Sequence, residues 1–397
     1  MALPLLEIAG TAFVAILIYN IISIYTSPLS KIPSAGFGAT FSRLLWTFPQ
    51  EYKGAITLTL PELHKKLGPL IRIGPNEVSF YSRETYETVH KVGSKFKKDP
   101  RVYGQFVQGG HAALFSITQV TTYANNCERL TDIQQRSGRA FQAKEDHGTA
   151  LFPNGEQLAM VEKNDEKATW MPVLTNFPML CEFWEHVEQS LYTLTGFRTK
   201  YSQGLLDFHD VALSAESDYG TSVSSPNLIQ TLCKAGLPAE TALSEAGENL
   251  GPGTDTTSAT LAHILWAFSH NPTFQDALYQ DLASVDFSTD MTTLENIPRL
   301  QACVKEGIRW AGAAAAMLPR IVPPGGIELH DTFIPEGTVL TSSPIWYLHD
   351  ENAFPNPKLY DPYRWLSKDG KDLTADVLRD RYYIPFSRGA NLCLGAQ

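Results

Sequence analysis

The stretch that decides the fold lies near the end of the chain and reads Pro385-Phe386-Ser387-Arg388-Gly389-Ala390-Asn391-Leu392-Cys393-Leu394-Gly395. It places an aromatic residue, two glycines and a cysteine at the spacing Phe-x-x-Gly-x-x-x-Cys-x-Gly. Glycine is needed where the backbone takes a positive φ or comes close to another group. A metal-ligating thiolate needs backbone amides around its sulfur. Four fixed positions within ten residues therefore favour Cys393 as a metal ligand.

The other cysteines have no comparable surroundings in the sequence, and they are Cys127, Cys181, Cys233 and Cys303. None of them has the Cys-x-x-Cys spacing of a structural zinc site, and an odd, sparse set argues against a disulfide framework. A lone cysteine is usually a small buried hydrophobic residue, which is what we expect for these four. Such cysteine usage suits a reducing compartment.

Composition indicates a large folded protein with a substantial core. Of the 397 residues, 43% are hydrophobic and 19% are charged, which argues against disorder. The 32 basic and 42 acidic residues give a formal charge of 32 − 42 = −10. An acidic chain of this kind does not fit a nucleic-acid partner.

Periodicity predicts that helices dominate, with a minor sheet in the N-terminal and C-terminal thirds. Residues 68–80 read as two short strands around a Gly-Pro-Asn turn. Long helices are predicted over 239–269, with Asn271-Pro272 as the stop, and over 294–310. A further helix is predicted over 177–194, where apolar residues recur at helical spacing, and we expect this stripe to pack in the core.

Two polar motifs lie within the predicted long helices. Gly253-Thr254-Asp255-Thr256-Thr257 places a carboxylate beside hydroxyl groups, which together can hold a water molecule and deliver a proton. The alternative is a surface turn rich in Thr and Ser. Glu306 and Arg309 share one helix face, so they can form an ion pair. Taken alone, that pair could equally be an ordinary surface contact of little energetic value.

Together these motifs resemble those of the cytochrome P450 superfamily, the haem-thiolate monooxygenases. The Cys393 loop is similar to the haem-binding signature of that superfamily. The resemblance implies that the Cys393 thiolate is the axial ligand of a haem b iron and that Phe386 and Gly389 belong to the cofactor-binding loop. It also implies that Asp255 and Thr256 are the catalytic pair that delivers protons during oxygen activation.

The resemblance assigns structural and cofactor roles to further basic residues. Arg364, within Tyr360-Asp361-Pro362-Tyr363-Arg364-Trp365, is expected to join Glu306 and Arg309 in a structural cluster under the haem loop. Arg320, which follows Leu318-Pro319, is expected to bind a haem propionate. A solvated arginine is the alternative for this residue.

The resemblance covers about 28–118 and 239–397, and this chain departs from the family pattern in three places. Asn391 stands where the family usually has Arg or His before the cysteine. The residues after Thr118 lack the expected basic cluster until Arg129. The chain stops at Gln397, shortly after Cys393. We therefore expect a mainly α (α+β) cytochrome P450 fold over 28–397, incomplete at its C-terminus.

The N-terminus has the character of a membrane anchor. From residue 8 to residue 25 there is no charged side chain. Eighteen residues rise about 27 Å as a helix, enough to span a bilayer core. A cleaved signal peptide would require Lys or Arg before the run, but only Glu7 is charged there. Lys31 and Arg43 follow the run and predict a cytoplasmic body. We therefore expect residues 1–27 to form a single-pass anchor in the endoplasmic reticulum membrane.

These features predict a membrane-bound monooxygenase that inserts one oxygen atom from O2 into an apolar small molecule. The resemblance implies NADPH–cytochrome P450 reductase as electron donor and is strongest to fungal microsomal members of secondary metabolism, which suggests a terpenoid or polyketide substrate. Two alternatives remain open: a non-catalytic truncated remnant, and a haem-thiolate peroxide isomerase that needs no reductase. The pair Asp255 and Thr256 favours the monooxygenase, because a rearrangement needs no external proton delivery.

Overall fold

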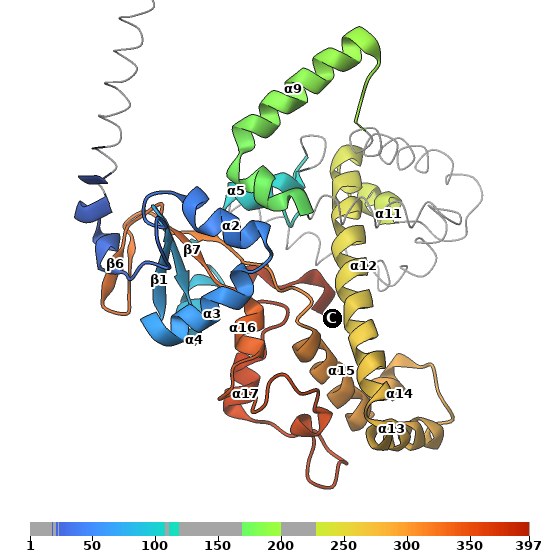
Figure 1. The fold of residues 1–397 in the computed structure, drawn as a ribbon. Helices are drawn as coiled ribbons and strands as arrows, with labels where there is room; N and C mark the ends of the chain where they lie inside the picture. The colour runs from blue at the N-terminus through green and yellow to red at the C-terminus, as the bar shows by residue number, and fades with distance from the viewer. Residues whose placement is uncertain are drawn as a thin grey trace, which may run out of the picture.

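The chain folds mainly into helices, with two small sheets at one side (Figure 1). A computed structural model describes residues 18, 21–22, 24–107, 111–118, 169–199 and 228–396. The α-helices within these ranges include α2 (Thr47–Tyr52), α3 (Ile56–Leu67), α4 (Arg83–Val89), α5 (Pro100–Tyr103), α9 (Pro178–Thr195), α11 (Leu228–Lys234), α12 (Ala239–Ser269), α13 (Pro272–Ser284), α14 (Met291–Glu295), α15 (Pro298–Ala311), α16 (Pro344–Leu348) and α17 (Val377–Tyr382). Short 3-10 helices include η1 (Pro28–Lys31), η2 (Arg43–Leu45), η3 (Gly104–Phe106), η4 (Pro362–Trp365), η5 (Gly389–Asn391) and η6 (Leu394–Ala396). The helix-rich fold with a minor sheet that the sequence predicted is confirmed.

The larger sheet joins segments from both ends of the chain in the order β1-β2-β7-β4-β3. Its strands are β1 (Leu70–Gly74), β2 (Glu77–Phe80), β3 (Lys97–Lys98), β4 (Arg320–Ile321) and β7 (Val339–Thr341). The predicted hairpin around the Gly-Pro-Asn turn is present as β1 and β2, which pair antiparallel. Strands β3 and β4 pair so that Lys98 lies opposite Arg320. A second sheet pairs β5 (Ile327–Leu329) with β6 (Thr332–Ile334).

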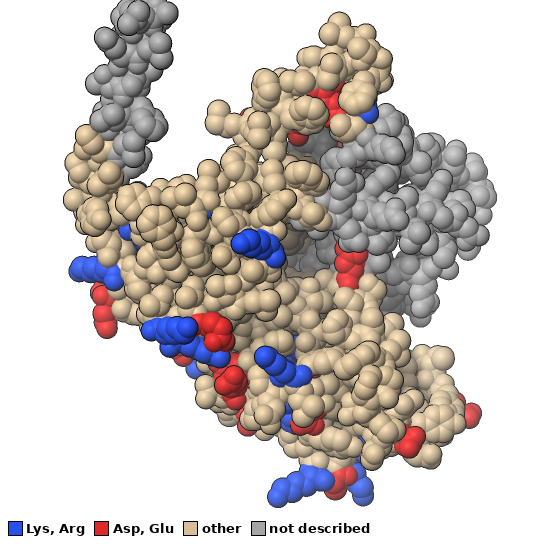
Figure 2. Space-filling model, in the orientation of Figure 1, with Lys and Arg blue, Asp and Glu red and all other residues tan. Residues whose placement is uncertain are grey.

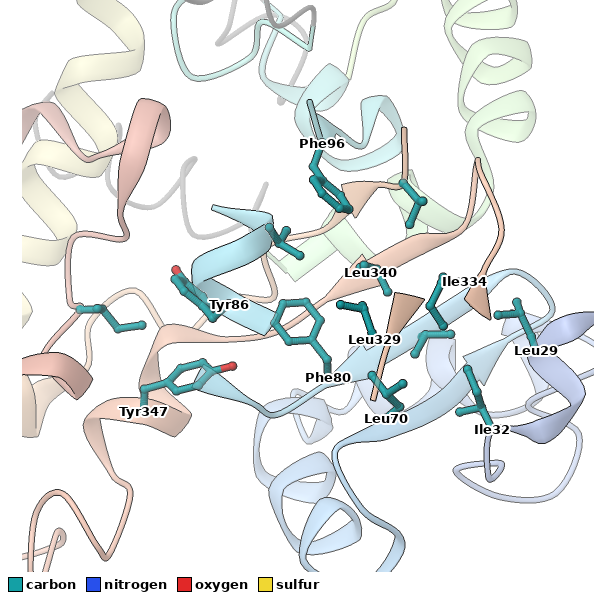
Figure 3. Close-up of a cluster of buried hydrophobic side chains, with 14 residues drawn as sticks. Leu29, Ile32, Leu70, Phe80, Tyr86, Phe96, Leu329, Ile334, Leu340 and Tyr347 are labelled. Carbon is teal, nitrogen blue, oxygen red and sulfur yellow. The ribbon is translucent and has the colours of Figure 1, made fainter. Parts of the chain in front are cut away.

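A hydrophobic cluster binds the larger sheet to α4 and α16 (Figure 3). Phe80 of β2, Tyr86 of α4 and Tyr347 of α16 are fully buried in it. The rings of Tyr86 and Tyr347 meet edge to face with centroids 5.0 Å apart. Burial of aromatic side chains of this size removes a large apolar area from water. The cluster therefore holds α4 firmly against the sheet, and α4 in turn contacts the cysteine loop.

Helices α12 and α15 pack closely against each other. The single helix predicted over 294–310 is divided in the structure, because α14 ends at Glu295 and α15 begins at Pro298. Helix α12 has the predicted bounds and ends where Asn271-Pro272 begins α13. Gly307 lies at the contact, because a Cβ on this residue would stand 2.3 Å from Cγ1 of Ile264. A glycine between Glu306 and Arg309 thus lets α15 approach α12 without a clash.

The prediction for the apolar stripe at 177–194 is half wrong. The helix is present as α9, but Trp184 is half exposed and Leu194 is 81% exposed, so the stripe is not core. Only Glu188 of this helix is buried. Helical spacing identified the element correctly but could not say which surface, if any, would cover its apolar face.

The start of the chain shows only part of the predicted anchor. Most of residues 8–25 lies outside the described ranges, and the described residues at its end include a short helical stretch at 24–26. Ile22 and Tyr25 are exposed there. Within the described parts of the chain, no helix combines the length and apolar character needed to cross a bilayer. The anchor at residues 1–27 therefore stays a prediction.

Candidate functional site

The Cys393 loop folds back on itself through two backbone hydrogen bonds. The Cys393 amide donates to the Phe386 carbonyl at 3.0 Å, and the Leu392 amide donates to the Gly389 carbonyl at 3.2 Å. Gly395 lies beside the thiol, with its added Cβ 3.7 Å from Sγ of Cys393. The side chain of Cys393 is exposed, so its sulfur is accessible to a ligand.

Position 389 requires a glycine for two reasons, its backbone conformation and the close approach of other backbone atoms. Its φ is +71°, in the left-handed region that favours glycine. A Cβ on this residue would lie 2.0 Å from the carbonyl oxygen of His90, at the end of α4. The loop is also tied to α4 by the Tyr86 hydroxyl, 3.0 Å from Oγ of Ser387. The predicted glycine thus seats the cysteine loop directly against α4.

The predicted cluster of Glu306, Arg309 and Arg364 is present and deeply buried. Glu306 and Arg309 are both 0% exposed. Arg309 binds the carboxylate in a bidentate manner, with Nε to Oε2 and Nη2 to Oε1 both at 2.8 Å. Arg364 donates from Nε to Oε1 at 3.0 Å. The ordinary surface-pair interpretation is thereby excluded.

Further hydrogen bonds of this cluster fix the chain between α16 and η4. Glu306 accepts from the Trp365 indole at 3.0 Å and from the Asp361 amide at 2.9 Å. Arg309 donates to three backbone carbonyls, those of Leu348, Pro357 and Leu359. Charge-assisted bonds of this kind are stronger than neutral ones. The cluster therefore joins α15 to the segment that leads to the cysteine loop.

Arg320 provides a test of whether a haem fits this site. The residue is 2% exposed, and its Nη1 donates to the Tyr103 hydroxyl at 2.7 Å and to the Pro319 carbonyl at 3.0 Å. Its buried Nε has no hydrogen-bond partner among the described residues. A buried guanidinium normally requires an anionic partner, and no described carboxylate forms an ion pair with this one. A haem carboxylate would supply that anion, so the site fits the cofactor.

Lys98 and Tyr103 also belong to this region, although the sequence did not point to them. Lys98 is buried opposite Arg320, and its ammonium donates to the carbonyls of Leu114 and Phe115 at 3.2 and 2.9 Å. The guanidinium carbon of Arg320 lies 5.3 Å from the ring centroid of Tyr103. Only the pairing of two strands far apart in sequence brings these side chains together, and local spacing carries no signal of it.

Asp255 and Thr256 lie in α12 and are both partly buried. The Thr256 carbonyl accepts a hydrogen bond from the Thr260 hydroxyl at 2.8 Å, a local bond that weakens the regular helical ladder. Ten residues before Asp255 in the same helix, the buried Glu245 carboxylate accepts a hydrogen bond from the Leu114 amide at 2.7 Å. Burial raises the pKa of Glu245 to about 7. The helix therefore carries titratable groups beyond the predicted pair. The sequence did not point to Glu245, because nothing in the residues around a single glutamate indicates that it is buried.

Comparison with known proteins agrees with the motifs. The cytochrome P450 family model matches residues 153–397. The chain is 27% identical to the cytochrome P450 monooxygenase macH of Penicillium terrestre, over 98% of this chain and 86% of the relative. It is 25% identical to the fusicoccadiene C-8 hydroxylase of Alternaria brassicicola, over 94% of this chain and 81% of the relative. It is 26% identical to the cytochrome P450 monooxygenase tazI of Aspergillus terreus, over 95% of this chain and 84% of the relative.

The match covers more than half of the chain and includes α12, α15 and the cysteine loop. Its residues contain the buried Glu306 cluster and the glycine that seats the loop against α4. The protein belongs to the cytochrome P450 family.

Proposed function

We propose that this protein is a haem-thiolate monooxygenase that inserts one oxygen atom from O2 into an apolar small molecule. The observation that carries the proposal is the glycine-framed Cys393 loop seated against α4. Similar proteins named as monooxygenases support it. The relative named fusicoccadiene C-8 hydroxylase supports a hydrocarbon-like substrate, such as an intermediate of secondary metabolism.

Each residue of the site has a defined task in this proposal. When bound, the haem supplies the activation of O2. The Cys393 thiolate holds the iron, and Phe386 and Gly389 shape the loop around that sulfur. Arg320 binds a haem carboxylate. The Thr256 hydroxyl holds a water molecule and, with the Asp255 carboxylate, passes protons into the site.

The direct test of the function uses isotopic oxygen. The purified protein is incubated with NADPH, a P450 reductase, 18O2 and a panel of apolar terpenes and polyketides. We expect a product that carries a single 18O atom and forms only with NADPH and reductase. A rearranged product formed from an organic peroxide without reductase would contradict the monooxygenase and favour the isomerase. A protein that binds no haem would instead be the non-catalytic remnant.

Thr256→Ala tests the proposed proton path. We expect this variant to bind haem normally, because Thr256 acts only during oxygen activation, but to divert reducing equivalents to hydrogen peroxide. General acid–base steps are typically worth about 10²- to 10⁴-fold, so oxygenated product should fall by about 10²-fold or more. NADPH use, peroxide and product are measured together. Thr257 is the exposed neighbour of Thr256, so Thr257→Ala is the matched control and should turn over like the parent. Unchanged turnover in Thr256→Ala would refute the assignment.

We further propose that residues 1–27 anchor the protein in the endoplasmic reticulum membrane, with the body in the cytoplasm and NADPH–cytochrome P450 reductase as electron donor. The uncharged run and the Lys31 that follows it support this orientation. Exposed apolar side chains near η2 and on α9, including Phe37 at 96% exposure and Met179, add support. In Figure 2 the upper left of the molecule is mostly tan, acidic atoms lie on α9, and charges of both signs lie over the lower part.

Removal of the first 33 residues tests the anchor. We expect a chain that begins at Ser34 to leave the membrane fraction under alkaline carbonate, because it lacks the apolar run. A full-length chain with Ile18→Lys and Ile22→Lys should also be released, since charges within the bilayer core are costly. The substitution Lys31→Gln, outside the run, is the control and should leave the protein in the membrane. Equal retention of all chains would show that the run is not the anchor.

A further inference from the structure

His90 is a buried histidine whose ring has no partner. It follows α4 directly, is 1% exposed, and neither ring nitrogen has a hydrogen-bond partner among the described residues. Buried polar groups are almost always hydrogen-bonded, because leaving one unpaired costs the desolvation of that group. A neutral imidazole carries one N–H donor and one acceptor. An unpaired imidazole at this depth therefore points to a ligand that the polypeptide itself does not provide.

The position of His90 relates it to the cysteine loop. Its carbonyl oxygen is the atom that a Cβ on Gly389 would approach to 2.0 Å. Its ring stacks on Tyr86, with centroids 4.2 Å and planes 22° apart, and the Tyr86 hydroxyl contacts Ser387 of the loop. One face of the imidazole is thus fixed by Tyr86, while both nitrogens at the ring edge stay free.

The electrostatic surroundings of His90 are positive. Burial, with the charges of Arg320 and Arg83, lowers the pKa of His90 well below its usual value. Arg320 is itself buried with a free Nε, and no described carboxylate pairs with it. The ring N–H of His90 and the Nε of Arg320 are therefore two buried donors without partners in a positively charged region, and such donors fit an anionic ligand. Asn391, in the loop, brings no positive charge of its own.

We propose that His90 donates a ring N–H hydrogen bond to a haem propionate and so complements Arg320 at a site where residue 391 is not cationic. This inference rests on the proposed haem binding. His90 is a positioning residue for the cofactor, because it contacts the periphery of the haem and not the reacting atoms. It is supplied by the end of α4, a part of the chain that the motifs did not identify.

The test compares His90→Phe with the parent as haem-loaded proteins. Phenylalanine keeps the stacking on Tyr86 and removes both nitrogens. The loss of one hydrogen bond to a charged group weakens a binding equilibrium, here that of haem with the protein, by about 10- to 100-fold. We therefore expect haem release to an excess of haem-free myoglobin to be about 10- to 100-fold faster. We also expect a shift of the propionate bending band in the resonance Raman spectrum, which a purely structural role would not produce.

The matched control is His64→Phe. His64 is similarly buried and near Tyr81, but both of its ring nitrogens are bonded, to the Gly68 carbonyl and the Ser79 hydroxyl. This variant should lose stability without moving the propionate band. His90→Gln, which keeps a donor, should restore most of the haem retention. If His90→Phe does not fold, His90→Gln is compared with His90→Met, an apolar side chain of similar length.

The outcomes separate this inference from the proposed function. A haem-loaded parent whose propionate band and haem release are unchanged in His90→Phe would overturn the inference alone. The same result in the comparison of His90→Gln with His90→Met would also overturn it. A parent that binds no haem would overturn both the inference and the proposed function. A shifted band in His90→Phe, with an unshifted band in His64→Phe, would support the inference.

Discussion

Replacing Glu306 with alanine is expected to lower the free energy of unfolding by about 3–5 kcal/mol, because it leaves two buried guanidinium groups without their anion. Arg309 is fully buried and Arg364 nearly so, and both donate to this carboxylate at 2.8–3.0 Å. A domain is stabilised by only about 5–15 kcal/mol in total. We therefore expect Glu306→Ala to yield little soluble protein and almost no bound haem. Urea unfolding and haem content measure the two effects.

The chain contains a matched control for this substitution. Glu62 and Lys65 form an ion pair at the same i, i+3 spacing, but both side chains are more than half exposed. Exposed pairs of this kind contribute little, because water and salt screen them. Glu62→Ala should therefore unfold like the parent. Similar stability of Glu306→Ala and Glu62→Ala would show that the buried cluster does not support the fold.

Replacing Gly389 with alanine is expected to abolish haem loading. The new Cβ would stand 2.0 Å from the His90 carbonyl oxygen and 2.6 Å from the Lys91 carbonyl carbon, and both are backbone atoms that cannot rotate away. Either the cysteine loop or the end of α4 must move. Because a displacement of about 1 Å can cost a site most of its function, we expect haem content to fall at least about 10-fold.

Gly93→Ala separates the steric clash from the cost of the backbone conformation. Gly93 has the same φ of +71°, but a Cβ on it meets nothing within 4 Å. Both variants therefore place alanine in the left-handed region, at a cost of about 1–2 kcal/mol. Only Gly389→Ala adds the collision with α4. Equal haem content in the two variants would contradict the close seating of the loop.

Local patterns predicted the elements and contacts whose determinants lie close together in sequence. Helix α12 has the predicted bounds, because apolar periodicity and the Asn271-Pro272 stop act locally. The Glu306 and Arg309 pair follows from helical spacing, and Arg364 followed from the family motif. Gly389 was identified by its place in the loop, and the structure adds the physical reason, which is the contact with α4.

Features that depend on distant segments could not be predicted in this way. The pairing of Lys98 with Arg320 depends on two strands more than two hundred residues apart. The unpaired ring of His90 becomes informative only when its burial and the position of the cysteine loop are known. The apolar stripe of α9 was assigned to the core wrongly, because periodicity reports that a face is apolar but not what covers it.

The central claim is that Cys393 binds the haem iron through its thiolate, and the ferrous carbon-monoxide difference spectrum tests it most directly. We expect the parent to show the far-red Soret band of a thiolate-ligated haem. Cys393→Ser should lose that band, whereas Cys303→Ser, which changes a buried cysteine away from the loop, should keep it. A parent spectrum without the band, or a Cys393→Ser variant that retains it, would contradict the account.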